Sequence, residues 1–200
     1  VPAAISRCRQ AGLEQEPYVF FPANFWAHKN HAMLLTVFQM FCHKHPESNL
    51  RLVFTGAPGE RMDFMRTAVR QMGLDERVTF AGFLSSRDYG CLLNGCRAMI
   101  FPSLFEGFGI PVLEAMRFGK PVFCSSTTSL PEVGGDAAGL FDPRRPSEIL
   151  QALETIAFEA ERLQSMAKKG VLQAARFPDA RTWAQDHLDI FNRVMDGGAE

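Results

Sequence analysis

Short apolar runs alternate with longer amphipathic stretches between residues 18 and 141. The apolar runs are three to six residues long and contain few polar residues, as is typical of strands buried on both faces of a sheet. They predict strands over residues 18–22, 50–55, 77–81, 98–102, 121–124 and 139–141. The amphipathic stretches predict helices over residues 31–43, 60–72, 86–94 and 110–118.

This alternation predicts an α/β fold, a Rossmann-like parallel sheet with helices on both faces. We expect residues 17–178 to form this domain, residues 1–16 to be a segment from an interdomain region, and residues 179–200 to form a C-terminal helix and tail. In such sheets ligands bind beyond the carboxyl ends of the strands, so the chemistry is expected in the loops that follow them. Three helical stretches are predicted after residue 141, over residues 147–158, 161–176 and 179–195.

Composition and charge exclude several classes of protein. The formal net charge is −1, so no overall field favours nucleic acid or an anionic membrane, and any phosphate recognition must be local. No apolar run reaches the roughly 20 residues that a membrane span needs, and the N-terminus lacks a signal-peptide pattern. The five cysteines include no C-x-x-C pair. This usage favours reduced thiols and a cytoplasmic location.

The loop that follows the predicted strand at 98–102 carries the strongest chemical signal. Gly107 and Gly109 permit backbone geometry and close ligand approach that a Cβ would obstruct, and Pro111 suits the first turn of a helix. That helix start offers free N–H groups and about half a positive charge from the dipole. Glu106 and Glu114 flank the turn. They could simply favour the helix start, but together with the glycines they favour a pocket for anions and hydroxyls.

Here the chain resembles a known family. Glu106 and Glu114, within FPSLFEGFGIPVLEAM, are similar to the E-x7-E signature of retaining glycosyltransferases of the GT-B fold, group 1 family, in their C-terminal, donor-binding half. The likeness covers residues 18–143. Its further motifs are the segments HKNH at 28–31, FAGF at 80–83, GKPV at 119–122, LPEV at 130–133 and GDAA at 135–138.

The resemblance implies a role for each end of a bound nucleoside diphosphate sugar. Glu114 would hold the ribose hydroxyls, and Glu106 would face the donor sugar as the catalytic residue, either as a nucleophile or by positioning the sugar. Phe83 and Leu84 would lie near the base. The loop 107–110 would contact sugar hydroxyls or phosphate, with Gly107 as part of the loop and the backbone N–H groups of Phe108, Gly109 and Ile110 as donors.

The diphosphate would pair with Lys29, which lies between His28 and Asn30. Many relatives carry an arginine a few residues before this lysine, whereas residues 23–28 contain none. His28, backbone N–H groups or an arginine elsewhere could take its place. The chain also lacks a D-x-D motif. Because Lys29 and the helix end can meet the charge of the leaving phosphates, we expect metal-independent transfer, with no metal site and no cofactor.

Other classes of function remain open. A dehydrogenase should show G-x-G-x-x-G after the first strand, where this chain has PANF at 22–25. A nucleotide-sugar epimerase of the same fold and a non-catalytic nucleotide-binding module both fit the pattern. We expect the partner of this half to be an N-terminal, acceptor-binding domain of the same enzyme, without which the chain should be inactive.

Overall fold

The computed structural model describes residues 16–178 and 180–197, so most of the predicted interdomain segment 1–16 lies outside the described residues. Six strands form one sheet: β1 (Tyr18–Pro22), β2 (Arg51–Thr55), β3 (Val78–Phe80), β4 (Ala98–Phe101), β5 (Val122–Ser125) and β6 (Gly139–Phe141). The α-helices are α2 (His31–Lys44), α3 (Glu60–Gln71), α4 (Ser86–Gly95), α5 (Ile110–Arg117), α6 (Leu130–Gly134), α7 (Pro146–Phe158), α8 (Ala160–Ala174) and α9 (Ala180–Gly197). Two short 3-10 helices are η1 (Ala27–Lys29) and η2 (Gly135–Ala137).

All neighbouring strands of the sheet run parallel, in the order β3-β2-β1-β4-β5-β6. The chain therefore builds outward from β1 in one direction, returns, and builds outward from β4 in the other. This is the doubly wound arrangement, in which the strand order reverses between β1 and β4. The predicted Rossmann-like parallel sheet is confirmed.

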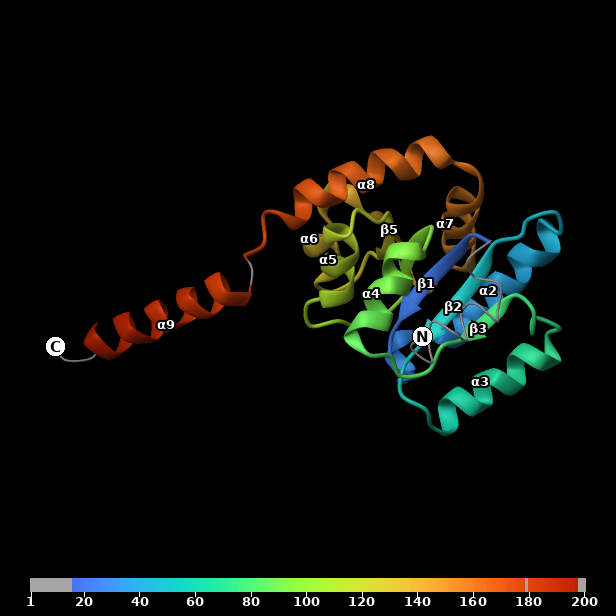
Figure 1. The fold of residues 1–200 in the computed structure, drawn as a ribbon, viewed down its shortest axis with the longest axis horizontal. Helices are drawn as coiled ribbons and strands as arrows, with labels where there is room; N and C mark the ends of the chain where they lie inside the picture. Colours follow the sequence, from blue (N-terminus) through green and yellow to red (C-terminus); the bar gives the residue numbers. More distant parts are fainter. Residues whose placement is uncertain (1–15, 179, 198–200) are drawn as a thin grey trace.

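Helices cover both faces of the sheet. On one face α2 packs against α7, and on the other α8 packs against α5 and α6. Figure 1 shows α4 in front of the sheet on the same side as α5, while α2 lies behind it. In the same view α9 extends away from the rest of the domain. Two covered faces explain why the strand sequences are almost continuously apolar.

Phenylalanines dominate the core between the sheet and its helices. Phe20, Phe21 and Phe54 on the strands have no exposed surface, nor does Phe38 on α2. Each such side chain contributes roughly 1.5–3 kcal/mol through burial. Phe21 packs edge-on against Phe101, with ring centroids 5.5 Å apart and an interplanar angle of 89°. This packing holds β1 and β4 together at the point where the strand order reverses.

The segment between β5 and β6 differs from the prediction. We predicted no helix between the strands at 121–124 and 139–141, whereas the structure has α6 and η2 between them. Parallel neighbours need a crossover connection, usually helical, and here it is short: α6 has five residues. Pro131 stands in its first turn, a position that proline favours.

Candidate functional site

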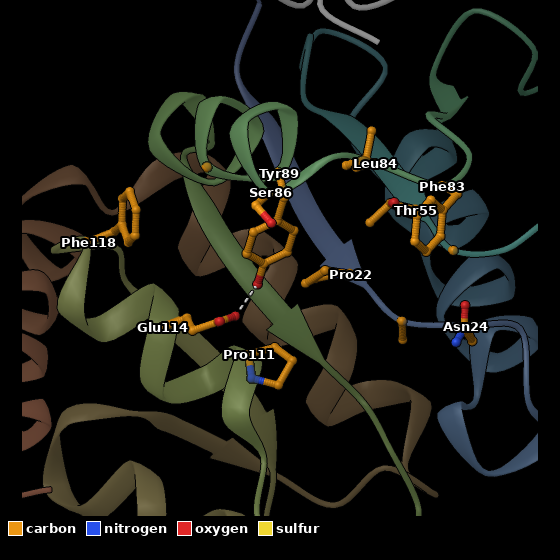
Figure 2. Close-up of a pocket in the computed structure, with 13 residues that line it drawn as sticks. Pro22, Asn24, Thr55, Phe83, Leu84, Ser86, Tyr89, Pro111, Glu114 and Phe118 are labelled. Carbon is orange, nitrogen blue, oxygen red and sulfur yellow. Dashed lines mark hydrogen bonds between the residues drawn. The ribbon is translucent and has the colours of Figure 1, made fainter. Parts of the chain in front are cut away.

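A cleft of about 530 Å³ opens at the carboxyl ends of β1 and β2, beside the reversal of strand order (Figure 2). Sequence analysis predicted a ligand site in the loops at this edge. The walls come from the segments that follow the first three strands and from α4 and α5. The lining residues are Pro22, Ala23, Asn24, Thr55, Gly56, Phe83, Leu84, Ser86, Tyr89, Gly90, Pro111, Glu114 and Phe118.

One wall of the cleft is fastened by hydrogen bonds between loops that are distant in sequence. The Thr55 hydroxyl donates to the Gly82 carbonyl oxygen over 2.6 Å, and the Gly56 N–H donates to the same oxygen over 3.1 Å. The Asn24 Oδ1 accepts from the Ala57 N–H over 2.8 Å. The loops after β1, β2 and β3 are thus tied together before any ligand binds.

The opposite wall carries a carboxylate held by a phenol. Glu114 lies on α5, and its Oε2 accepts a hydrogen bond of 2.7 Å from the Tyr89 hydroxyl on α4, drawn as a dashed line in Figure 2. Burial raises the pKa of Tyr89, and the hydrogen bond to the Glu114 carboxylate and its charge raise it further. The phenol therefore stays protonated and acts as the donor.

The start of α4 sets the position of Tyr89. Ser85 caps the helix by accepting from the Asp88 N–H, and the Ser85 hydroxyl donates to the Asp88 carboxylate over 2.9 Å. An N-cap of this kind fixes the first turn of a helix. Tyr89 follows within that turn, and its ring lies 5.8 Å from the ring of Phe20 on β1. The phenol is thus anchored at both its backbone and its ring.

Lys29 and Glu106, the predicted diphosphate and sugar residues, form an ion pair with Nζ and Oε1 2.6 Å apart. Their side chains are only 13% and 10% exposed, so the two charges compensate each other away from most solvent. The Lys29 ammonium also lies 5.4 Å from the ring centroid of Phe101, within cation–π range. The structure therefore brings these two residues together, although neither lines the cleft that Glu114 faces.

The backbone of Glu106 is clamped by the loop after β5. Its N–H donates to the Thr128 hydroxyl and its carbonyl accepts from the Ser129 hydroxyl, both over 3.1 Å. Thr128 itself has a positive φ of 56°, an unusual conformation for a β-branched residue. This polar clamp was absent from the sequence predictions.

The turn from Glu106 into α5 leaves donors unused. Gly109 precedes α5 with φ +97°, and a Cβ there would meet the Cδ2 of buried Leu130 at 2.5 Å. Within residues 16–178 and 180–197 the N–H groups of Phe108, Gly109 and Ile110 donate no hydrogen bond. These are the three groups that the resemblance assigns to sugar or phosphate.

The turn before α2 is pinned to the same loop. Asn30 adopts a left-handed conformation with φ 64°, and its side-chain amide donates to the carbonyls of Pro102 and Pro143. The His28 carbonyl accepts from the Leu104 N–H over 2.7 Å. In this structure Asn30 and His28 thus hold Lys29 next to the loop of Glu106, and they do not line the cleft.

The predicted site residues therefore fall into two adjoining groups. Phe83, Leu84 and Glu114 line the cleft, whereas Lys29, Glu106 and the turn 107–110 occupy the loops beside it. The sequence analysis missed Tyr89, Asn24, Thr55 and Ser86. Thr55 is the last residue of β2, Asn24 lies two residues after β1, and Ser86 and Tyr89 lie at the start of the helix that follows β3. That placement at the carboxyl ends of strands was the available signal.

His31, at the start of α2, is a buried histidine beside these loops. Its ring stacks on Phe25 and lies against Phe21, each centroid 4.5 Å away. Burial lowers its pKa to about 4, opposed by a hydrogen bond with the Ala23 backbone and assisted by the charge of Lys29. The imidazole is therefore neutral at pH 7.

Two features of the described residues bear on ligands and location. No three His, Cys, Asp or Glu side chains of residues 16–178 and 180–197 gather as a metal site would require. In the same part of the chain, no helix has both the length and the apolar character of a membrane span.

Comparison with proteins of known sequence gives mannosyltransferases among the relatives. The chain is 31% identical over 171 residues to O-antigen chain mannosyltransferase B of Escherichia coli, covering 82% of this chain and 43% of that protein. It is 36% identical over 124 residues to the serotype-specific mannosyltransferase WbdA of Escherichia coli, covering 62% of this chain and 15% of that one. The chain thus spans less than half the length of these relatives.

Solved structures share the fold. The Anabaena protein HepE, crystallised with UDP and glucose, superposes with a TM-score of 0.81 at 20% identity, covering 96% of this chain and 53% of that one. Sucrose-phosphate synthase of Thermosynechococcus elongatus gives 0.80 at 21% identity, covering 98% and 50%. The family model described as "Glycosyl transferases group 1" matches residues 7–172. With that match over most of its length, the chain belongs to the group 1 glycosyltransferase family.

Proposed function

We propose that this chain is the donor-binding half of a retaining glycosyltransferase and that it binds a nucleoside diphosphate sugar at the cleft beside the β1–β4 reversal. The observation that carries the proposal is the Glu114 carboxylate facing this cleft, on the helix that begins directly after the loop of Glu106. A carboxylate can accept hydrogen bonds from two neighbouring hydroxyls, as a ribose diol offers. The exposed ring of Phe83 at the far wall offers a surface for the base.

The sugar and diphosphate would then lie toward the loop 106–110. The unused N–H groups of this turn and the dipole of α5 suit phosphate or sugar oxygens. Lys29 supplies a cation beside them, and Glu106 supplies a carboxylate for sugar hydroxyls. When the donor binds, the Lys29–Glu106 ion pair would separate. Lys29 would then contact the diphosphate, and Glu106 would contact the sugar on the other side of the glycosyl phosphate bond.

For the donor we propose a mannosyl nucleotide, because relatives at 31% and 36% identity are named mannosyltransferases. We further propose that transfer needs no metal ion: Lys29 and the helix dipole can take up charge on the leaving diphosphate, and the chain has no D-x-D motif. Since the chain spans about half of its solved relatives, the acceptor surface is assigned to a second domain.

Calorimetry with this chain tests the proposal. UDP, GDP and ADP and their sugar esters would be titrated in EDTA and again with Mg²⁺, with inorganic pyrophosphate as the control for simple anion binding. We expect one nucleotide to bind in EDTA, and its mannose ester to bind more tightly. At a hundredfold excess over Kd such a ligand stabilises the fold by about 2.7 kcal/mol. The proposal would be contradicted if none of the nucleotides bound, or if pyrophosphate bound and the nucleotides did not.

A product assay separates transfer from the alternative reading as an epimerase. The chain alone should neither move the sugar to an acceptor nor invert a sugar carbon, because transfer needs an acceptor held beside the donor. Chromatography of the sugar nucleotide after incubation measures both reactions. An inverted sugar in the product would favour an epimerase, and efficient transfer would show that the chain already contains an acceptor site.

A further inference from the structure

The Tyr89–Glu114 hydrogen bond sits in the cleft wall, yet Tyr89 belongs to no motif noted in the sequence. We infer that Tyr89 is a positioning residue, which fixes the Glu114 carboxylate so that the cleft selects ligands carrying a ribose diol. The inference rests on the proposed function, since it names the residue that orients the carboxylate assigned to the nucleoside.

The first step concerns the freedom of the Glu114 side chain. A glutamate on a helix can point its carboxylate in several directions, because three side-chain torsions separate it from the backbone. In the described residues the only hydrogen bond to its carboxylate comes from Tyr89. That bond engages Oε2 and leaves Oε1 without a protein partner in this part of the chain.

The second step concerns the rigidity of the donor. Tyr89 is held at its backbone by the capped start of α4, and at its ring by Phe20. Its hydroxyl acts as the donor in this pair, because a carboxylate accepts hydrogen bonds and the phenol keeps its proton. The phenol therefore restrains the Glu114 carboxylate. A carboxylate that is already restrained loses less conformational entropy when it accepts hydrogen bonds from a ligand.

The third step concerns selectivity. A site built to hydrogen-bond a hydroxyl rejects the analogue that lacks it, because its polar groups are then left unpaired. A carboxylate that is free to turn toward water would avoid this penalty and select less well. Removing the Tyr89 hydroxyl should therefore reduce preference for the diol more than it reduces binding of the rest of the nucleotide.

The test compares two ligands on Tyr89→Phe. Calorimetry would give Kd for whichever of UDP, GDP or ADP binds the wild-type chain most tightly and for its 2′,3′-dideoxy counterpart. Kd of the dideoxy ligand divided by Kd of the ligand with the diol is the diol selectivity. We expect Tyr89→Phe to lower the diol selectivity about fivefold to tenfold, within the range of one ordinary net hydrogen bond, because the Glu114 carboxylate itself remains; Kd for the dideoxy ligand should change less than twofold.

Tyr18→Phe is the matched control. Tyr18 is the other tyrosine of the two in the chain, and its hydroxyl also donates a hydrogen bond, to the buried Leu92 carbonyl. It does not line the cleft. This variant should lose stability and keep the wild-type selectivity, so a stability effect alone cannot imitate the expected result.

A double-mutant cycle separates positioning from direct contact. If Tyr89 acts through Glu114, Tyr89→Phe should leave the selectivity unchanged when Glu114 is already alanine. An equal loss of affinity for both ligands, or an unchanged ratio in Tyr89→Phe, would overturn the inference while leaving nucleotide binding intact. A wild-type chain that binds no nucleotide would instead overturn the proposed function beneath it.

Discussion

Replacing Gly109 by alanine should destabilise the chain far more than the same change two residues earlier at Gly107. Gly109 has φ +97°, and an added Cβ would lie 2.5 Å from the Cδ2 of Leu130. Leu130 has no exposed surface, so it cannot swing into solvent. Gly107 has no atom within 4 Å of its virtual Cβ and no positive φ. The two glycines of one loop therefore differ in both backbone strain and available space.

The magnitude follows from these two observations. A left-handed conformation costs an alanine about 1–2 kcal/mol, and forcing extra atoms into a packed core costs typically about 1–3 kcal/mol. Reduced freedom of the unfolded chain returns about 0.4–1 kcal/mol. Gly109→Ala should thus lower the free energy of unfolding by about 2–4 kcal/mol, and Gly107→Ala should change it by about 1 kcal/mol or less.

Urea unfolding followed by circular dichroism measures this difference. The midpoint should fall in Gly109→Ala while the slope m stays that of the wild type, since the surface exposed on unfolding is the same. For a chain of this size the corresponding drop in Tm is roughly 4–16 °C. Equal stability of the two variants would refute the reasoning, because it would mean that neither the clash with Leu130 nor the left-handed backbone constrains this turn.

Two further predictions concern charge. Burial holds the pKa of His31 at about 4, below its unfolded-state value of about 6.5. The contribution of His31 to the free energy of unfolding is therefore complete above pH 6.5 and is lost as the pH falls toward 4. Lowering the pH from 7.5 to 5 should thus reduce the free energy of unfolding by about 2 kcal/mol. Urea titrations at both pH values should show that His31→Gln no longer has this pH-dependent loss, whereas His43→Gln, at an exposed position, keeps it. If His31→Gln lost as much stability at pH 5 as the wild type, the prediction would be wrong. Lys29→Met should lower the free energy of unfolding by about 1–3 kcal/mol, because it leaves the Glu106 charge without its partner. The exposed Lys168→Met should change it by less than about 0.5 kcal/mol, and equal values for the two variants would contradict a buried ion pair.

The sheet and its long helices could be predicted because burial on two faces leaves a direct trace in the sequence. The run YVFFP became β1 without a change of boundary, and the helix predicted over 31–43 extends only one residue further. By contrast α6 has five residues, too few for a helical period to show. Only the parallel topology, which demands a crossover, would have predicted it.

The site was predictable as a location and less so as a set of contacts. Glu114 was singled out because glycines and a proline mark the turn before its helix, and the structure places it in the wall of the cleft. Tyr89 was missed because its partner Glu114 lies 25 residues away on another helix. Helical periodicity predicts which face of a helix is buried, but it does not predict which residues of two helices pair. Lys29 and Glu106 were both predicted as site residues, but their direct pairing over 77 residues depends on how two strand ends meet.

The measurement that tests the central claim most directly is the affinity of two glutamate variants for two ligands. Calorimetry would give Kd of Glu114→Gln and Glu106→Gln for the nucleoside diphosphate and for its sugar ester, with Glu161→Gln, at an exposed position on α8, as the control. We expect Glu114→Gln to weaken both ligands by similar factors, roughly 10- to 150-fold, as for a charge-assisted hydrogen bond. Glu106→Gln should leave the diphosphate almost unchanged and remove the added affinity of the sugar. If Glu106→Gln weakened the plain diphosphate as much as Glu114→Gln did, the assignment of the nucleoside to one glutamate and the sugar to the other would be wrong.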